Sequence, residues 1–196
     1  QSFSRYWDRI NRPEQIISSF PQAISTMLDP SDCGPVFFGL PQDIQGEAYN
    51  YPSVFFEKKV HYIRRPRPDL KSIREASNII KESKKPLIIS GGGVFYSQAE
   101  KELASFAKKH NIPVVETIAG RSVLIHDNPL NTGPIGVIGS SSANTLAKEA
   151  DVVIAIGTRL QDFVTGSWSV FTNEDMKLIS INSARYDANK HMAVSV

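Results

Sequence analysis

The sequence predicts an α/β fold in which a parallel β-sheet is flanked by helices. Two observations carry this prediction. From Asp69 onward, short apolar segments rich in Val and Ile alternate with longer segments whose apolar residues recur every three or four positions, and several of the short segments end at glycine. Short apolar strands that alternate with amphipathic helices are typical of βαβ units with right-handed crossovers.

Composition narrows the class of protein. The chain has 196 residues, with 22 Lys and Arg against 20 Asp and Glu and 41% hydrophobic residues. This length allows one large domain, or one domain and part of another. The near-balanced charge of +2 argues against a dedicated nucleic-acid or membrane-surface binder. We therefore expect a globular protein with no nucleic-acid and no membrane partner.

The single cysteine and the first residues of the chain indicate where the protein is located and whether the chain is part of a longer one. A single cysteine, Cys33, excludes an internal disulfide and fits a reducing compartment, so we expect a cytoplasmic protein. No apolar run approaches the roughly 18–20 residues of a membrane span. The chain begins at Gln1 without the apolar core of a signal peptide. We expect it to begin part-way through a longer protein.

Residues 1–45 contain one helical pattern and one apolar run. Apolar residues at three- and four-residue steps between Ile16 and Leu28 predict a helix, with Pro13 in its first turn. Pro21 lies inside the pattern and should kink or interrupt it. The run 35–40 (PVFFGL) predicts a strand buried on both faces, although this region supplies almost no neighbours for it. We expect an apolar edge there that favours pairing or aggregation.

Residues 46–68 have the composition of a connector. Pro66 and Pro68 favour an extended chain, and the aromatic residues of the segment indicate that it packs along a surface. A basic run is interpreted as a solvated linker rather than a nucleic-acid site; it comprises Lys58, Lys59, His61, Arg64, Arg65 and Arg67.

From Asp69 the elements follow in regular order. Asp69 is a suitable N-cap for a helix that reaches about Lys84, and Ser97 for a second helix that ends near Asn111. A second glycine cluster at Gly133, Gly136 and Gly139 leads into a helix over 140–147, and loop flexibility with helix capping explains it without a ligand. The strands are expected at 86–90 (PLIIS), 113–116 (PVVE), 151–156 (DVVIAI) and 177–181 (KLISI).

The turn Gly91, Gly92 and Gly93 is the most suggestive candidate site. Glycines between a strand and a helix allow backbone to approach a ligand, and Glu116 closes the next strand where a dinucleotide-binding unit has its ribose-binding acid. However, Tyr96 occupies the position of the third glycine of that motif and should hinder close approach of helix and strand. A tight structural turn is the favoured alternative.

Thr158 and Arg159 form the second candidate, since they follow a strand at the edge where ligands of open α/β sheets gather. Arg159 is a candidate anion contact; pairing with Asp162 or with a neighbouring domain is the alternative. The four histidines share no metal-ligand spacing, and no nucleophile or phosphate-loop motif is present. The residues alone therefore predict an α/β domain with no metal site and no catalytic residues.

Several segments resemble a known family. KPLIISGGG (85–93), NIPVVET (111–117) and ADVVIAIGTRLQD (150–162) resemble the central domain of thiamine-diphosphate-dependent enzymes of the acetolactate synthase type. Residues 12–45 are similar to the last helix and strand of that family's pyrimidine-binding domain. The resemblance implies a pyrimidine-domain tail over 1–45, a linker over 46–68 and a Rossmann-like central domain over 69–196, possibly truncated at its C-terminus.

Within this family, residues 6–13, 40–45 and 160–168 are similar to the hydrolases that cleave a C–C bond of a cyclic 1,2-dione in inositol catabolism. The resemblance implies thiamine diphosphate, Mg²⁺ and a homo-oligomer for the intact enzyme. The family's activating glutamate and diphosphate-binding motif have no counterpart here. We therefore expect a fragment that lacks its pyrimidine- and diphosphate-binding domains, binds no cofactor and is inactive alone.

Other functions remain open at this stage. One is another thiamine-diphosphate carboligase of the acetolactate synthase type, in which the equivalent domain also holds FAD; the turn 159–162 partly resembles that pattern, but we do not predict flavin. The others are a stand-alone dinucleotide-binding module and a non-catalytic scaffold. The ligand-edge candidates are Gly91, Gly92, Gly93, Thr158 and Arg159.

Overall fold

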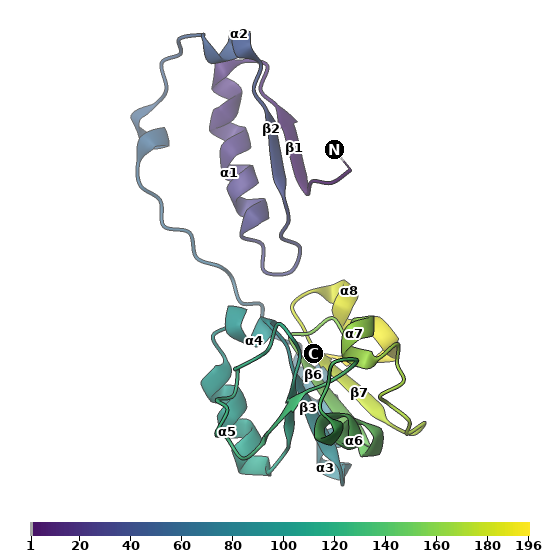
Figure 1. Ribbon diagram of the computed structural model, residues 1–196. Coiled ribbons are helices and arrows are strands. Elements are labelled where there is room, and N and C mark those ends of the chain that lie inside the picture. The colour runs from purple at the N-terminus through teal and green to yellow at the C-terminus, as the bar shows by residue number, and fades with distance from the viewer. Residues whose placement is uncertain (1) are drawn as a thin grey trace. The chain divides into compact units, whose positions relative to one another are not determined.

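A computed structural model describes residues 2–196. The chain divides into two compact units, which are described separately: an N-terminal unit that ends at Pro66 and a C-terminal unit that begins at Arg67 (Figure 1).

The C-terminal unit is built on a six-stranded sheet in which every strand pair is parallel. The strand order is β5-β4-β3-β6-β7-β8, so the chain runs outward from β3 to β5 and then returns to the other side of β3. This confirms the predicted α/β fold with a parallel sheet. The strands are β3 (Pro86–Ser90), β4 (Val114–Glu116), β5 (Asn131–Pro134), β6 (Val152–Ile156), β7 (Lys177–Ile181) and β8 (Val194–Ser195).

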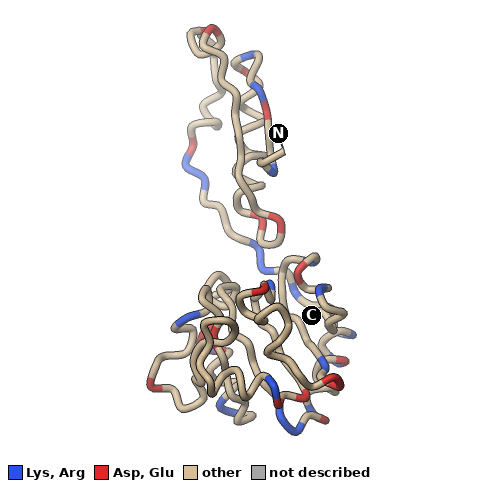
Figure 2. Tube along the Cα trace, turned by 45° about the vertical axis from the view of Figure 1, so that its right-hand side comes forward, with Lys and Arg blue, Asp and Glu red and all other residues tan. Residues whose placement is uncertain are grey.

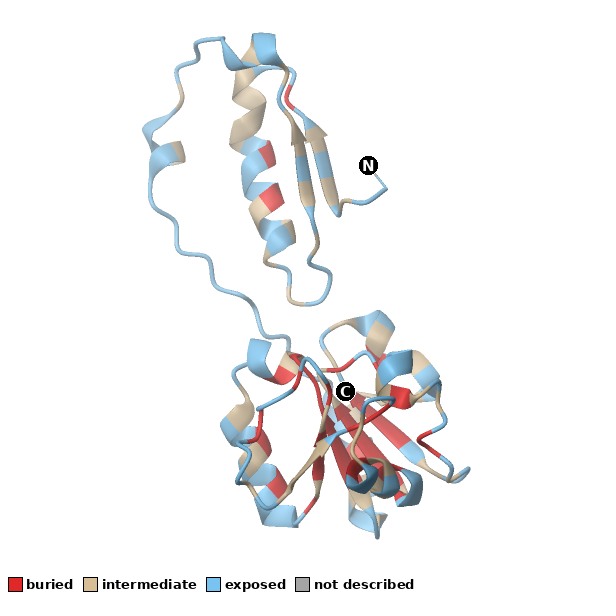
Figure 3. Cartoon of the chain, viewed as in Figure 1, coloured by how far each residue is buried: buried red, intermediate tan, exposed pale blue. Residues whose placement is uncertain are grey.

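Helices cover both faces of this sheet. Ile88, Ile154 and Ile179 pack in one core with residues of α3 (Leu70–Glu82), α4 (Gly93–Tyr96) and α5 (Glu100–His110). On the other face Leu87, Ile89 and Val153 pack against Ala143 and Ala147 of α6 (Ser141–Glu149). Figure 3 shows the resulting buried strands in red. The remaining short helices are α7 (Asp162–Thr165), α8 (Arg185–Ala188) and the 3-10 turn η3 (Lys190–Met192).

Most helix ends agree with the sequence. The Asp69 carboxylate accepts hydrogen bonds from the amides of Lys71 and Ser72, and Asn111 ends α5 in the left-handed conformation. The predicted Ser97 cap is wrong. Ser97 follows α4, and α5 begins only at Glu100. The reason is that Gly93 opens the one-turn helix α4 directly after β3, and Gln98 at φ 53° redirects the chain before α5.

Two edge strands, β5 and β8, are absent from the sequence prediction. β5 has the sequence NTGP, with no apolar run, and β8 has two residues. Edge strands are half-solvated and short, so hydrophobic pattern carries little information about them.

The N-terminal unit is a parallel pair of strands with one helix. β1 (Tyr6–Arg9) pairs with β2 (Val36–Gly39), with Tyr6 opposite Val36. The predicted helix is confirmed as α1 (Ile16–Met27), preceded by the turn η1 (Pro13–Gln15). Pro21 does not interrupt α1, because buried Ser19 and Ala23 hold the helix on either side of it. The other short elements are α2 (Gln42–Gln45) and η2 (Ser53–Phe56).

β2 is not buried on both faces, and that prediction is wrong for this chain. Phe37 is 51% exposed, whereas the other three residues of the strand are half-buried. Within residues 2–196, β2 has one strand neighbour, β1, which the sequence did not predict. Asp8 links β1 to α1, since its carboxylate accepts hydrogen bonds from Ser19 Oγ and Gln15 Nε2.

The connector packs by its aromatic residues, as expected. The Tyr51 hydroxyl donates to the Pro13 carbonyl at 3.1 Å, and its ring stacks on Phe55 with centroids 5.6 Å apart. Beyond this cluster, residues 57–67 are exposed throughout. Figure 2 shows their basic positions in blue along an extended trace.

Candidate functional site at the carboxyl edge of the sheet

The structure brings the five ligand-edge candidates to one edge of the sheet. Gly91, Gly92 and Gly93 follow β3, and Thr158 and Arg159 follow β6. The two strands are neighbours, with Ser90 opposite Ile156, so both turns leave the sheet side by side.

The two turns touch through their backbones. The Gly91 amide donates to the Ile156 carbonyl at 2.8 Å, and the Gly93 amide donates to the Gly157 carbonyl at 2.9 Å. A Cβ at Gly91 would lie 2.3 Å from the Gly157 oxygen, and one at Gly93 would lie 2.6 Å from the Gly157 Cα. Gly157 itself has φ +59°. This packing requires glycine at these positions without any ligand, which favours the structural-turn alternative.

The polar side chains at this edge differ in how accessible they are to a ligand. Thr158 is buried, its Oγ1 accepts from the Leu160 amide at 3.3 Å, and its carbonyl accepts from Asn182 Nδ2 at 3.1 Å. Arg159 is exposed, and the ion pairs found among residues 2–196 do not include one between Arg159 and Asp162.

Three side chains near this edge were not predicted from the sequence. Lys190 Nζ donates to the Arg159 carbonyl at 3.2 Å and pairs with Asp187 at 3.5 Å, so a second cation lies beside Arg159. Asn182 holds the Thr158 carbonyl. Ser90 is 1% exposed, and its Oγ has no hydrogen-bond partner in the described part of the chain. Of these three residues, only Ser90 could have been singled out from the sequence, because it is the last residue of the predicted strand before the glycine turn.

Tyr96 and Glu116 do not act as the dinucleotide motif suggests. Tyr96 is 87% exposed at the end of α4, so the prediction that it obstructs the approach of helix and strand is wrong. Because α4 has only one turn, this position never reaches the strand. The Glu116 carboxylate accepts from the Ser122 amide at 3.0 Å and thereby holds the loop after β4.

The second glycine cluster is also explained by packing. Gly136 has φ +101°, and a Cβ there would lie 2.0 Å from the Phe163 oxygen. The Asn144 side chain accepts from the Gly136 amide at 2.9 Å and donates to its carbonyl at 3.0 Å. Ser140 caps α6, which confirms the predicted capping. The loop is held by these hydrogen bonds on both sides.

The described residues contain a possible anion contact but no metal-binding cluster. Among residues 2–196 there is no grouping of three or more His, Cys, Asp or Glu side chains that could hold a metal. Cys33 is free and exposed. None of the helices in this described part has both the length and the apolar character needed to cross a membrane. At this edge the exposed Arg159 can contact a negatively charged group, whereas Lys190 is already paired with Asp187.

Comparison with known proteins decides the family. Residues 73–196 match the family model described as the central domain of thiamine pyrophosphate enzymes. The chain belongs to this family. The family resemblance and the Rossmann-like α/β fold expected from the sequence are both confirmed.

Several relatives of this chain share one enzyme name. The chain is 48% identical over 196 residues to 3D-(3,5/4)-trihydroxycyclohexane-1,2-dione hydrolase 1 of Bacillus cereus. It is equally similar to hydrolases of that name from Bacillus anthracis and Bacillus thuringiensis. Each match covers 100% of this chain and 30% of the relative. These matches confirm the expected similarity to hydrolases of a cyclic 1,2-dione, and the chain spans about a third of the length of these relatives.

Proposed function

We propose that this chain is part of a thiamine-diphosphate-dependent hydrolase that cleaves a C–C bond of a cyclic 1,2-dione in inositol catabolism. The observation that carries the proposal is the 48% identity over the whole chain to enzymes named for that substrate. An acetolactate synthase-like carboligase has the same central domain, but the similarity to the hydrolases also extends through the N-terminal unit.

The chain's own part in this reaction is structural. Thiamine diphosphate, when bound, supplies the stabilised carbanion for C–C bond cleavage. We assign no diphosphate or Mg²⁺ site to this chain, because its sequence contains no Gly-Asp-Gly motif of the kind with which the family holds them, and the described residues contain no metal-binding cluster. No catalytic step is therefore assigned to this chain. Its sheet and helices form a scaffold, with residues 1–45 as the tail of a pyrimidine-binding domain, 46–68 as linker and 69–196 as the central domain.

The remaining parts of the enzyme are proposed from the same similarity. They are a pyrimidine-binding and a diphosphate-binding domain of the longer protein, Mg²⁺ as the metal, and a second copy in a homo-oligomer. Cys33 as a free, exposed thiol supports a cytoplasmic location. The near-balanced charge supports the absence of a nucleic-acid or membrane partner.

The test is a parallel assay of the longer protein and of the 196-residue chain. With thiamine diphosphate, Mg²⁺ and trihydroxycyclohexane-1,2-dione, the longer protein should open the ring, and the chain alone should show neither turnover nor calorimetric cofactor binding. Tight Mg²⁺-dependent binding by the chain alone would contradict the structural role. Formation of acetolactate from pyruvate without ring opening would support the carboligase instead.

A second candidate function is contact with a nucleotide or flavin through Gly91, Gly92, Gly93, Thr158 and Arg159. The exposed Arg159 beside Lys190 favours it, whereas the hydrogen bonds already made by the Gly91 and Gly93 amides disfavour it.

Titration of the chain with NAD, FAD and ADP distinguishes the two roles. We expect no saturable signal. A signal that Arg159→Gln abolishes and that Arg185→Gln, an exposed control on α8, leaves intact would establish this edge as a ligand site.

A further inference from the structure

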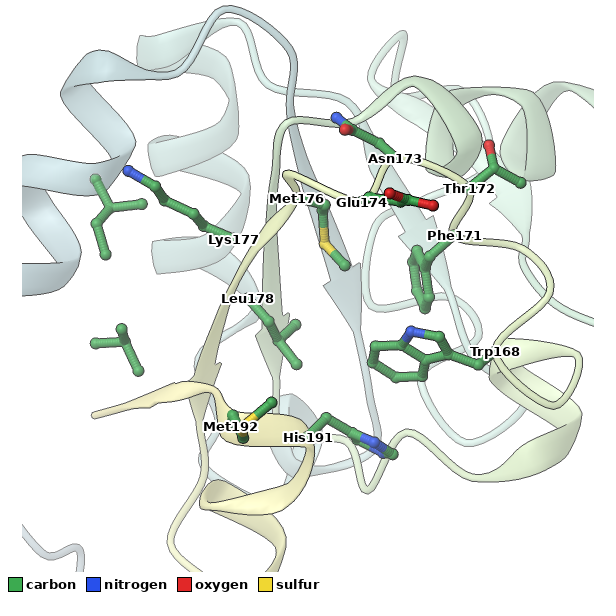
Figure 4. Close-up of a pocket in the computed structure, with 12 residues that line it drawn as sticks. Trp168, Phe171, Thr172, Asn173, Glu174, Met176, Lys177, Leu178, His191 and Met192 are labelled. Atoms are coloured by element: carbon green, nitrogen blue, oxygen red, sulfur yellow. The ribbon is translucent and has the colours of Figure 1, made fainter.

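An apolar groove of about 500 Å³ lies beside β7 and β8, in the C-terminal unit. Its apolar lining includes side chains of α3, of the segment before β7, of β7 itself and of β8, together with Trp168 and Met192. The side chains from these four elements are Ile79, Phe171, Met176, Leu178 and Val194. Figure 4 shows Trp168 between Phe171 and His191 on one side of the groove, with Met176 and Leu178 facing them.

The groove lies beside the start of β7, before β8 begins at Val194. β8 pairs with β7 only at Ile179 and Ser180, so Lys177 and Leu178 have no strand partner on that side within residues 2–196. Sheets made only of parallel strands are covered by helices on both faces. α3 covers β8 on one face. On the other face the described chain supplies Trp168 and Phe171 from a loop.

The wall formed by Trp168 is held in place. Its ring centroid lies 5.0 Å from that of Phe171 and 4.2 Å from that of His191. Trp168 has φ 72° and His191 has φ 57°, both in the left-handed region that non-glycine residues avoid. The Trp168 amide donates to Thr165 Oγ1 at 3.2 Å, which stabilises this strained turn. Backbone strain of this kind persists only where the surrounding structure over-determines it.

The polar side chains at the end of the groove already have partners. Thr172 Oγ1 donates to the Lys148 carbonyl at 3.3 Å, and Asn173 Nδ2 donates to the Ala150 carbonyl at 3.0 Å. Small-molecule sites combine apolar walls with a few polar groups that converge on the ligand. Apart from His191, which stacks on Trp168, the other side chains that line the groove are apolar, and the charges of Glu174 and Lys177 are exposed at its rim. The groove therefore suits a binding segment whose apolar side chains form one stripe with charged side chains on either side of it.

We propose that this groove is the seat of an amphipathic helix supplied by the longer protein. The stripe of that helix packs on Leu178, Met176 and Val194 and covers the unpaired edge of β7. The helix is expected from the longer protein, because this chain spans only 30% of the length of its relatives and matches a domain that is central in its family. The proposal rests on family membership and is independent of the reaction, so failure of the proposed chemistry leaves it standing.

Methionine oxidation tests the proposal directly. Met192 lines the groove and is 98% exposed in this chain, whereas Met27, the internal reference, lies in α1 of the N-terminal unit and is 50% exposed. With hydrogen peroxide and peptide mass spectrometry, Met192 should oxidise about tenfold more slowly in the longer protein than in the shorter chain, because the docked helix must first open. Equal Met192 rates in the two proteins would overturn the proposal.

A charge substitution gives a second, independent readout. Met192→Glu should leave the unfolding midpoint of the shorter chain unchanged and lower that of the longer protein, because only there does the helix cover it. Tyr186→Glu, 82% exposed and outside the groove, is the matched control and should be neutral in both. Loss of stability from Met192→Glu in both proteins, or in neither, would overturn the proposal. So would Met192 protection that appears in the chain alone and rises with its concentration, since a second copy would then be the occupant.

Discussion

Strands β2 and β3 are similar in sequence and differ in surroundings. The two apolar runs are PVFFGL and PLIIS, yet four residues of β3 are buried and none of β2 is. β3 has a strand on each side and helices on both faces, whereas β2 has one strand neighbour and packs against α1. An apolar run therefore specifies a strand, but its burial depends on the neighbours that the rest of the fold provides.

The unfolding of the two units can be followed separately in one molecule by tryptophan fluorescence. The sequence has two tryptophans, Trp7 in β1 and Trp168 in the C-terminal unit. Trp7→Phe leaves a fluorescence signal from the C-terminal unit, and Trp168→Phe leaves one from the N-terminal unit.

The largest expected difference is between core truncations in the two sheets. Ile88 of β3 is fully buried, so Ile88→Ala should destabilise the C-terminal unit by about 2–5 kcal/mol. Phe37 of β2 is 51% exposed and stacks on Trp7, so Phe37→Ala should cost the N-terminal unit about 1 kcal/mol. Urea unfolding followed by the tryptophan of each unit measures both. Equal losses would show that the strands are equally buried in solution.

The next effect separates packing from ligand binding at the glycine turn. Gly91→Ala places a Cβ 2.3 Å from the Gly157 oxygen, so the C-terminal unit should lose about 1–3 kcal/mol or more. Gly92→Ala is the matched control, because its Cβ would meet the Ala119 Cβ at 3.1 Å and cause a smaller loss. If Gly91→Ala left the unfolding midpoint unchanged, the glycine would be explained by something other than backbone packing.

A carboxylate in each unit makes stability depend on pH. Burial alone would raise the pKa of Asp151, but hydrogen bonds from Ser83 Oγ and from the amides of Lys84 and Lys85 outweigh it and lower the pKa below 3.8. The ionised form therefore stabilises the folded state above the ordinary pKa, and this stability is lost as the pH falls through the lowered value. Asp151→Asn should cost about 1–2 kcal/mol at pH 7 and flatten the acid dependence, while the exposed Asp127→Asn should change neither.

Asp8 is the counterpart of Asp151 in the N-terminal unit. The hydrogen bond from Ser19 lowers the pKa of Asp8, and those from Gln15, the Arg9 amide and Tyr6 add to this effect against the opposing effect of burial. Asp8→Asn should flatten the acid dependence of the N-terminal unit, followed by Trp7, and leave that of the C-terminal unit unchanged. A shift in the Trp168 signal instead would show that the two units unfold together.

The smallest effect on stability is expected in the connector. Lys58, Lys59 and Arg64 lie in an exposed, extended segment, so trypsin should cut there first, and the bonds before Pro66 and Pro68 should resist it. Replacing the three residues by Gln should change the unfolding free energy by less than about 0.5 kcal/mol and abolish early cleavage. Early products cut inside α3 or α5 would contradict an exposed connector.

Much of the C-terminal unit follows from local sequence. The strands at 86–90 and 177–181 have the predicted bounds, and Asp69 and Ser140 cap the helices expected of them. These features depend on apolar runs buried on both faces and on side chains that reach their own backbone, so a few neighbouring residues suffice to specify them. The family was recognisable from such segments as well.

Other features were decided only by the tertiary structure. Glycine at 91 and 93 is required by Gly157, which is distant in the chain. β1 is a strand because β2 pairs with it, and the groove beside β7 lies where that strand has no partner, since β8 begins only opposite Ile179. The sequence by itself determined the α/β class, the four central strands of the large sheet in their order, and the family. Three features depend on which distant segments become neighbours: the backbone contacts at the carboxyl edge, the exposure of β2 and the groove. Local sequence patterns do not contain this information.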